Sequence, residues 1–295
     1  HNLFGIIGST DHHNAFPGSY GYGRLGVWSG ALTRDAIWEA IKQRRTYVLT
    51  GDRIELGFAL NDTVIGGIAP ANPNRDIQVS VAGGSAIDYI DVLHNNRVIY
   101  RESVLPQPED TSTKFKIYVE MGCAERDEAY AWDVRLSITD GQLLDGEPRL
   151  RGYGPSVSPD DDDFAYSTID TSQPNCVQLK TRTRRNQSLH TSSTEGFSVE
   201  IEGTPDTHLK AEVNGHIYDL TLQDLMTGSR SFYMGGFVSP VICFHRAVPE
   251  SEYIRQFTFH HVNHTTDRDW YYVRVRQHNN QWAWSSPIWV HGGES

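Results

Sequence analysis

The chain has 295 residues, 38% of them hydrophobic and 21% charged, a composition typical of a globular protein with one large or two medium domains. A formal charge of −11 argues against sequence-independent binding to nucleic-acid phosphates. No apolar run approaches the roughly eighteen residues of a membrane span. We therefore expect no nucleic-acid partner and no membrane span.

The first predicted element is a short strand at residues 2–8, apolar on both faces, as is typical of a parallel sheet covered by helices. A loop rich in glycine and tyrosine follows it, and residues 33–45 then predict the clearest helix of the chain. Thr33 is the expected N-cap, and Asp35 lies in the first turn, where the helix dipole favours an anion. Residues 46–51 predict a second strand, which completes one βα unit and its return.

From residue 54 onward, strand patterns are separated by Asn, Asp, Gly and Pro turns, with no helical pattern between them. Strands of this length and spacing are typical of β-sandwiches. The expected strands are 54–60, 76–82, 87–93, 114–120, 130–138, 196–203, 208–213, 216–220 and 254–262. A polar stretch from residue 153 to about residue 175 predicts a linker or a long excursion between two such blocks.

The clearest hairpin lies near the end of the printed sequence. In DWYYVRVRQ (269–277), successive side chains of the predicted strand point to opposite faces of the sheet. The expected inward set is Tyr271, Val273 and Val275, and the outward set is Tyr272, Arg274 and Arg276. A turn at Asn279-Asn280 leads back into a strand pattern with three tryptophans.

A polar motif, Thr10-Asp11-His12-His13, directly follows the first predicted strand. In an extended segment, residues two apart point to the same side, so Asp11 and His13 would converge while His12 points away. A carboxylate and an imidazole together suit Zn, Mn or Fe better than Ca. The alternative left open by these residues is a polar turn in which Asp11 caps local amides.

Three stretches together resemble one family: STDHHNAFPGSYGYGR, LTRDAIWEAIKQRRTYVLTGDRI, and YYVRVRQ followed by AWSSPIWV. They are similar to the C-terminal part of PHP (polymerase and histidinol phosphatase) metal-dependent hydrolases. The match is to a little-characterised bacterial branch, in which β-rich domains follow a distorted TIM-like barrel. The resemblance covers most of the chain and is strongest at residues 4–60 and 228–290.

The resemblance implies that Asp11 and His13 are metal ligands, and that Asp11 also acts in catalysis by bridging an ion and orienting the attacking water. It implies two or three divalent ions (Zn, Mn or Fe) and hydrolysis of a small phosphoester by a metal-activated water. The residues expected to contact substrate are His12, Tyr22, Arg24 and Arg45. For Arg45 the alternative is that it complements the C-terminus of the predicted helix.

Two ligands do not hold a catalytic metal cluster, and the family's HxH signature has no counterpart in this sequence. We therefore expect an upstream barrel segment or a second chain to supply the remaining ligands, and enzyme activity only from the completed site. The predicted strand at 2–8, which lacks nearby partner strands, points the same way. A dense histidine cluster at 260–264 (HHVNH) has a spacing that does not predict convergence on one ion.

The predicted fold is mainly β (α+β): a terminal βα piece of a distorted TIM-like barrel, followed by two β-sandwich-like units. The expected domains are 1–53 with the metal motif, 54–152, and 153–295 ending in the long hairpin. Two other hypotheses remain: a non-catalytic binding module and a structural extracellular protein. Trp282, Trp284 and Trp289 would serve the former by stacking if exposed.

Three cysteines, Cys123, Cys176 and Cys243, occur without a CxxC motif, so their disulfide state stays open. Cys243 lies inside the apolar run PVICFH and is predicted to be a buried small hydrophobic residue rather than a nucleophile. The β-sandwich pattern and the family resemblance favour a periplasmic or extracellular setting, and the compartment is otherwise unassigned.

Overall fold

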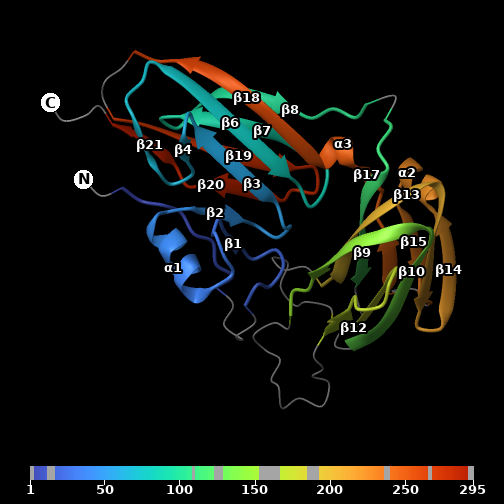
Figure 1. The fold of residues 1–295 in the computed structure, drawn as a ribbon. Helices are drawn as coiled ribbons and strands as arrows, with labels where there is room; N and C mark the ends of the chain where they lie inside the picture. The colour runs from blue at the N-terminus through green and yellow to red at the C-terminus, as the bar shows by residue number, and fades with distance from the viewer. Residues whose placement is uncertain are drawn as a thin grey trace. The chain divides into compact units, whose positions relative to one another are not determined.

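Strands account for 59% and helices for 8% of the residues that the computed structural model describes, which confirms a mainly β chain (Figure 1). The described residues are 3–11, 17–107, 110–122, 129–152, 167–184, 193–235, 240–264 and 268–291. They fall into two compact units. Unit 1 comprises His1–Asp11, Tyr20–Glu109 and Ser251–Ser295, and unit 2 comprises His12–Ser19 and Asp110–Glu250.

Unit 1 contains two mainly antiparallel sheets and the helix α1 (Arg34–Lys42). The larger sheet follows the order β1-β2-β20-β19-β21-β5, with β7 paired to β19 and β8 to β7, and the smaller follows β18-β6-β3-β4. Only the β21–β5 pair among these described strands is parallel. The strands are β1 (Arg24–Val27), β2 (Thr46–Leu49), β3 (Glu55–Leu60), β4 (Thr63–Val64), β5 (Ile68–Pro70), β6 (Asn74–Ala82), β7 (Ile87–His94), β8 (Arg97–Ser103), β18 (Ile254–Val262), β19 (Asp269–Gln277), β20 (Trp282–Ser285) and β21 (Ile288–His291).

The two sheets of unit 1 share one apolar core. Every second residue of β6 is buried, and β19 alternates in the same way, with Tyr271, Val273 and Val275 fully inside. These residues form one cluster with the buried residues of β3 and β7. The alternation predicted for 269–277 is therefore confirmed. Burying one such side chain contributes about 1.5–3 kcal/mol.

Helix α1 begins as the sequence predicts. Thr33 is the N-cap, and its Oγ1 accepts a hydrogen bond from the backbone N–H of Ala36 (3.3 Å). The helix ends at Lys42, earlier than predicted, because Arg44 adopts a left-handed conformation with φ of +60°. None of the helices in the described ranges is long and apolar enough to cross a membrane.

Unit 2 is built on one nine-stranded sheet, in the order β11-β12-β10-β13-β9-β16-β15, with β14 paired to β13 and β17 to β9. A six-residue helix, α2 (Leu222–Thr227), follows β14, and a one-turn helix, α3 (Glu250–Tyr253), leads back to unit 1. The strands are β9 (Lys114–Gly122), β10 (Ala129–Arg149), β11 (Thr168–Asp170), β12 (Cys176–Arg184), β13 (Glu195–Val213), β14 (His216–Thr221), β15 (Arg230–Tyr233), β16 (Val241–Phe244) and β17 (Val248–Pro249).

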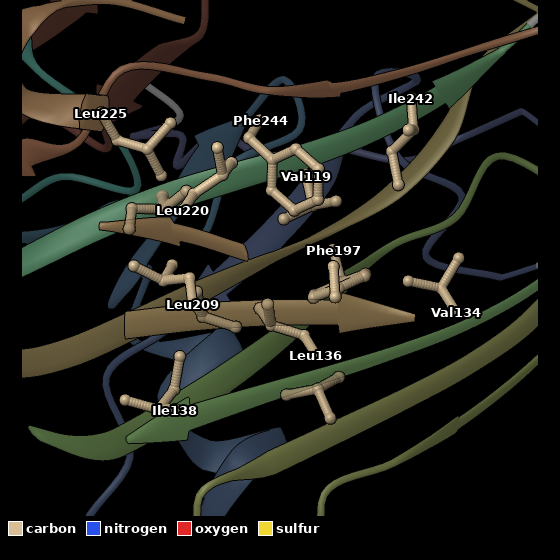
Figure 2. Packing of buried hydrophobic residues seen from close by; sticks show 14 of the residues in the cluster. Val119, Val134, Leu136, Ile138, Phe197, Leu209, Leu220, Leu225, Ile242 and Phe244 are labelled. Atoms are coloured by element: carbon tan, nitrogen blue, oxygen red, sulfur yellow. The ribbon is translucent and has the colours of Figure 1, made fainter. Parts of the chain in front are cut away.

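The core of unit 2 lies on one face of this sheet. Two register shifts, at Thr139/Gly141 and Leu143/Asp145, interrupt the long β10–β13 ladder, and such bulges bend a sheet. Figure 2 shows the result, in which side chains from β9, β10, β13 and β16 pack into one apolar cluster with Leu225 of α2. The bend lets a single sheet enclose its own core.

The predicted strand at 2–8 is wrong for the described residues 3–8. They join no ladder, and the side chains of Phe4 and Ile7 are 58% and 67% exposed. Side-chain hydroxyls take the place of a ladder: Ile6 N–H donates to Ser286 Oγ (3.0 Å), and Thr46 Oγ1 donates to the Ile6 carbonyl (2.8 Å). The apolar run therefore lies as an extended segment on unit 1 and is not a buried parallel strand.

The predicted consecutive domains differ from the two units. β19 and β20 lie near the end of the sequence yet pair with β7 and β2, and a boundary at residue 152 separates β10 from its ladder partners β12 and β13. The barrel piece is not confirmed either, because β1 and β2, which flank α1, pair antiparallel to each other. Pairing between distant strands leaves no local signal in the sequence.

We predict that Phe197→Ala lowers the free energy of unfolding of unit 2 by about 3–5 kcal/mol, because it leaves a cavity in a fully buried cluster. Ile217→Ala is the matched control: this side chain is 64% exposed, and the loss should stay within about 0.5 kcal/mol. Denaturant unfolding followed by fluorescence measures both variants. Equal losses would contradict the position of the core.

Candidate functional site

The segment that carries the predicted metal motif runs beside the β1–β2 pair. A Cβ on Gly8 would lie 2.4 Å from the Arg24 carbonyl oxygen, and a Cβ on Gly23 would lie 2.6 Å from the Ser9 carbonyl oxygen. Both positions therefore require glycine for close backbone approach. The contact between Gly23 and Ser9 brings the loop that precedes β1 onto the segment that ends at Asp11.

Asp11 is exposed and has a left-handed backbone with φ of +48°. Its N–H donates to Ser9 Oγ (3.3 Å). The chain is therefore not extended at Asp11, and the alternation argument that aligned Asp11 with His13 does not apply there. His12 and His13 lie outside the described residues, so their convergence with Asp11 stays a prediction.

The residues predicted to contact substrate separate into two places. Tyr22 is 38% exposed, and the guanidinium of Arg24 lies 5.8 Å from the ring centroid of Tyr20. Both flank Gly23, at the end of the β1–β2 pair near Ser9. Arg45 is exposed and directly precedes β2. The residue that pairs with Arg24 is Leu49, at the other end of β2, so Arg45 lies about 13 Å from it along the strand. Tyr22 and Arg24 thus adjoin Gly23, which contacts the segment ending at Asp11, and Arg45 lies at the other end of β2.

No group of three or more His, Cys, Asp and Glu side chains in the described ranges is arranged to hold a metal ion. Asp11 therefore belongs to no such group within the described part of the chain. That an upstream barrel segment or a second chain supplies the remaining ligands stays a prediction.

A buried polar cluster of unit 1 centres on Asp269, at the start of β19, and sequence reasoning missed it. The Asp269 carboxylate accepts hydrogen bonds from Arg75 Nη1 (2.7 Å), Asn95 Nδ2 (2.9 Å) and Asn263 Nδ2 (3.0 Å), and contacts His94 Nε2 at 2.9 Å. Burial alone would raise the pKa of Asp269, but hydrogen bonds from Asn95, Arg75 and His94 outweigh it and lower the pKa to about 2. Asp269 is therefore ionised at neutral pH.

Two histidines border this cluster. His94 stacks on Tyr271 (4.6 Å between ring centroids), and His261 Nδ1 lies 2.9 Å from the Tyr271 hydroxyl. Burial, with the electrostatic influence of His94 and Arg75, lowers the pKa of His261 and favours its neutral form. His260 points the other way and pairs with Asp76 (2.7 Å), so the HHVNH cluster divides between two faces of β18.

The Asp269 cluster ties the two sheets of unit 1 together. Arg75 comes from β6 of the smaller sheet, and His94 and Asp269 come from β7 and β19 of the larger one. The charged groups of the cluster satisfy one another, which indicates a structural role. Arg75 and Asp269 are 194 residues apart, so no local sequence motif predicts the pair.

The tryptophans proposed as stacking residues are largely covered. Trp289 is 6% exposed, and Trp282 and Trp284 are half-buried and stack on each other at 5.5 Å with an interplanar angle of 5°. The guanidinium groups of Arg274 and Arg276 lie 5.8 and 5.5 Å from the Trp282 ring centroid. These cation–π contacts cover ring surface that a ligand would need. The Trp282–Trp284 pair therefore packs against its own sheet.

Comparisons of the chain with protein-family models, with curated proteins and with solved structures gave no match. The case for a metal site therefore depends on the Asp11 motif and its surroundings.

We predict that Asp269→Asn lowers the free energy of unfolding at pH 7 by at least about 2 kcal/mol, because it leaves the buried guanidinium of Arg75 without its countercharge. A carboxyl whose folded pKa is depressed stabilises the fold above its unfolded pKa, and this stability is lost as the pH falls through the folded pKa. The difference between wild type and variant should therefore shrink as the pH falls from about 4 toward about 2.

Chemical denaturation across this pH range measures the effect. Asp76→Asn is the control, because the Asp76–His260 pair is exposed on both sides and should contribute less than about 1 kcal/mol. A deficit for Asp269→Asn that is absent, or constant down to the lowest pH, would contradict the role of the charge.

Proposed function

We propose that this chain is the C-terminal portion of a metal-dependent hydrolase acting on phosphoesters, to which it contributes Asp11 and His13 as metal ligands. The observation that carries the proposal is the close approach of Gly23 to Ser9, which sets Tyr22 and Arg24 beside the segment ending at the exposed Asp11. A carboxylate, a cation and a phenol gathered at one end of the β1–β2 pair are the groups that a metal-bound phosphate needs around it.

The chemistry of this chain's own residues fits such a site. The exposed Asp11 carboxylate offers oxygen ligands, and His13 is the nitrogen ligand that the motif supplies. The Arg24 guanidinium can bind phosphate oxygens in bidentate fashion, and the Tyr22 hydroxyl can donate one further hydrogen bond. The two or three divalent ions (Zn, Mn or Fe) would provide the activated water and stabilise the developing charge.

Exposed apolar side chains in unit 1 are compatible with a protein that completes the site. Six of the large apolar side chains exposed in the described ranges lie within residues 4–38 of unit 1. They are Phe4, Ile7, Tyr22, Trp28, Leu32 and Trp38. Exposed apolar side chains that adjoin one another on a surface are typical of a site that another protein covers. We propose that an upstream barrel segment or a second chain covers this region and supplies the remaining ligands.

We predict that Asp11→Asn and His13→Gln each reduce the metal bound per chain at least about tenfold, because each removes a direct ligand. Elemental mass spectrometry of the protein, purified from its source without chelator and with whatever co-purifies, measures Zn, Mn and Fe. His12→Gln is the matched control and should keep its metal. A wild-type protein without metal, or equal loss in all three variants, would contradict the proposal.

We predict that Arg24→Ala raises the KM for an aryl phosphate about 10- to 100-fold in the completed enzyme, because it removes a charge-assisted hydrogen bond to the substrate. Arg45→Ala should leave KM unchanged, since Arg45 lies beyond the opposite end of β2. Steady-state kinetics on the metal-loaded protein distinguishes the two. A larger effect of Arg45→Ala would place the substrate elsewhere.

A further inference from the structure

A second group of reactive side chains lies in unit 2, away from the core. Cys243 on β16 pairs in register with Glu120 on β9, and His245 follows Cys243 by two residues. Ile242 and Phe244 point into the core, so Cys243, His245 and Glu120 share the opposite face. Cys243 is half-buried there, which corrects the prediction that it is a buried core residue.

The three side chains form a linear relay. His245 Nε2 lies 2.8 Å from Glu120 Oε2, and the thiol of Cys243 hydrogen-bonds the His245 imidazole. The hydroxyl of Ser231, which pairs in register with Cys243 from β15, hydrogen-bonds the same thiol. A nucleophile held by a base, with the base oriented by a carboxylate, is the arrangement that activates cysteine.

The electrostatics favour the charged form of this relay. Hydrogen bonds to Cys243 and Glu120 raise the pKa of His245 to about 9, so its imidazole is protonated at neutral pH. Burial opposes ionisation of the Cys243 thiol, but the hydrogen bonds from His245 and Ser231 and the charge of His245 outweigh it, and the thiol pKa lies below its ordinary value. The negative charge of Glu120 limits this shift.

The surrounding groups position the imidazolium. The ring of Tyr118 stacks on His245 at 5.0 Å, and the guanidinium of Arg149 lies 4.8 Å from the Tyr118 ring centroid. Thr194 hydrogen-bonds Glu120, and the positive charge of Arg151 helps to keep Glu120 ionised. The side chain of His245 is 39% exposed and Cys243 is half-buried, so the relay is not sealed inside the core.

We propose that Cys243 is an activated thiol that forms a mixed disulfide with low-molecular-weight disulfides. The Cys243 thiolate attacks one sulfur of the small disulfide, its sulfur–sulfur bond breaks, and one half leaves as a thiolate. The leaving thiolate takes the proton from the His245 imidazolium, so the reaction is balanced with no further oxidant. Attack at sulfur needs no oxyanion hole, so the thiol, imidazole and carboxylate supply the groups that this reaction requires.

A pyridyl disulfide probe tests the proposal on the full chain. Peptide mass spectrometry reports the modification rate of each cysteine from about pH 5 to about pH 10. We expect the rate at Cys243 to reach half of its maximum well below the value of about 8.5 for an ordinary thiol. Cys176, buried at 4% exposure in the same unit, is the internal reference and should react far more slowly.

His245→Asn should move this midpoint up to or above the ordinary thiol value and lower the rate at about pH 6 at least about tenfold. Glu120→Gln should give a smaller shift in the same direction. His208→Asn is the matched control, since His208 pairs with Asp219 (2.9 Å) elsewhere in unit 2 and should change nothing. An ordinary wild-type midpoint, or modification of Cys243 only after denaturation, would overturn the proposal even if the variants fail to fold.

Discussion

The structure of unit 1 depends on the pairing of β19 with strands from distant parts of the chain. β19 bonds β20 and β21 from its own end of the sequence, and β7 from the first hundred residues. Its side chains alternate, so a slip of one residue would turn Tyr271, Val273 and Val275 out of the core. The buried Asp269 and its partners on β6 and β7 hold the register at one end of this strand.

The same pairing holds the segment that carries Asp11. β20 pairs with β2, and Ser286, which directly follows β20, binds both Ile6 and Thr46. The segment that leads to the predicted metal motif is therefore held by a residue from the other end of the sequence. The N-terminal strands β1 and β2 and the late strands β19, β20 and β21 thus contribute to this one larger sheet.

Local features of the fold could be predicted from the sequence, and non-local ones could not. The Thr33-capped helix and the alternation of β19 depend on residues close in sequence, and both are confirmed. The apolar run at 3–8 led to a wrong strand prediction. Its composition is that of a buried strand, but its backbone hydrogen-bonds to side-chain hydroxyls instead of to a neighbouring strand. The Arg75–Asp269 and His245–Glu120 pairs join residues more than one hundred positions apart, which no local spacing reveals.

One geometric rule separates the two candidate sites. Side chains two apart converge only where the backbone stays extended. At Asp11 the backbone is left-handed, so the extended-strand argument does not bring it toward His13. At Cys243 the strand stays extended, and the bond from His245 N–H to the Tyr118 carbonyl (2.9 Å) continues the ladder past β16. The thiol and the imidazole therefore share one face of the strand. The opposite face carries Ile242 and Phe244, whose burial in the core of unit 2 fixes the register.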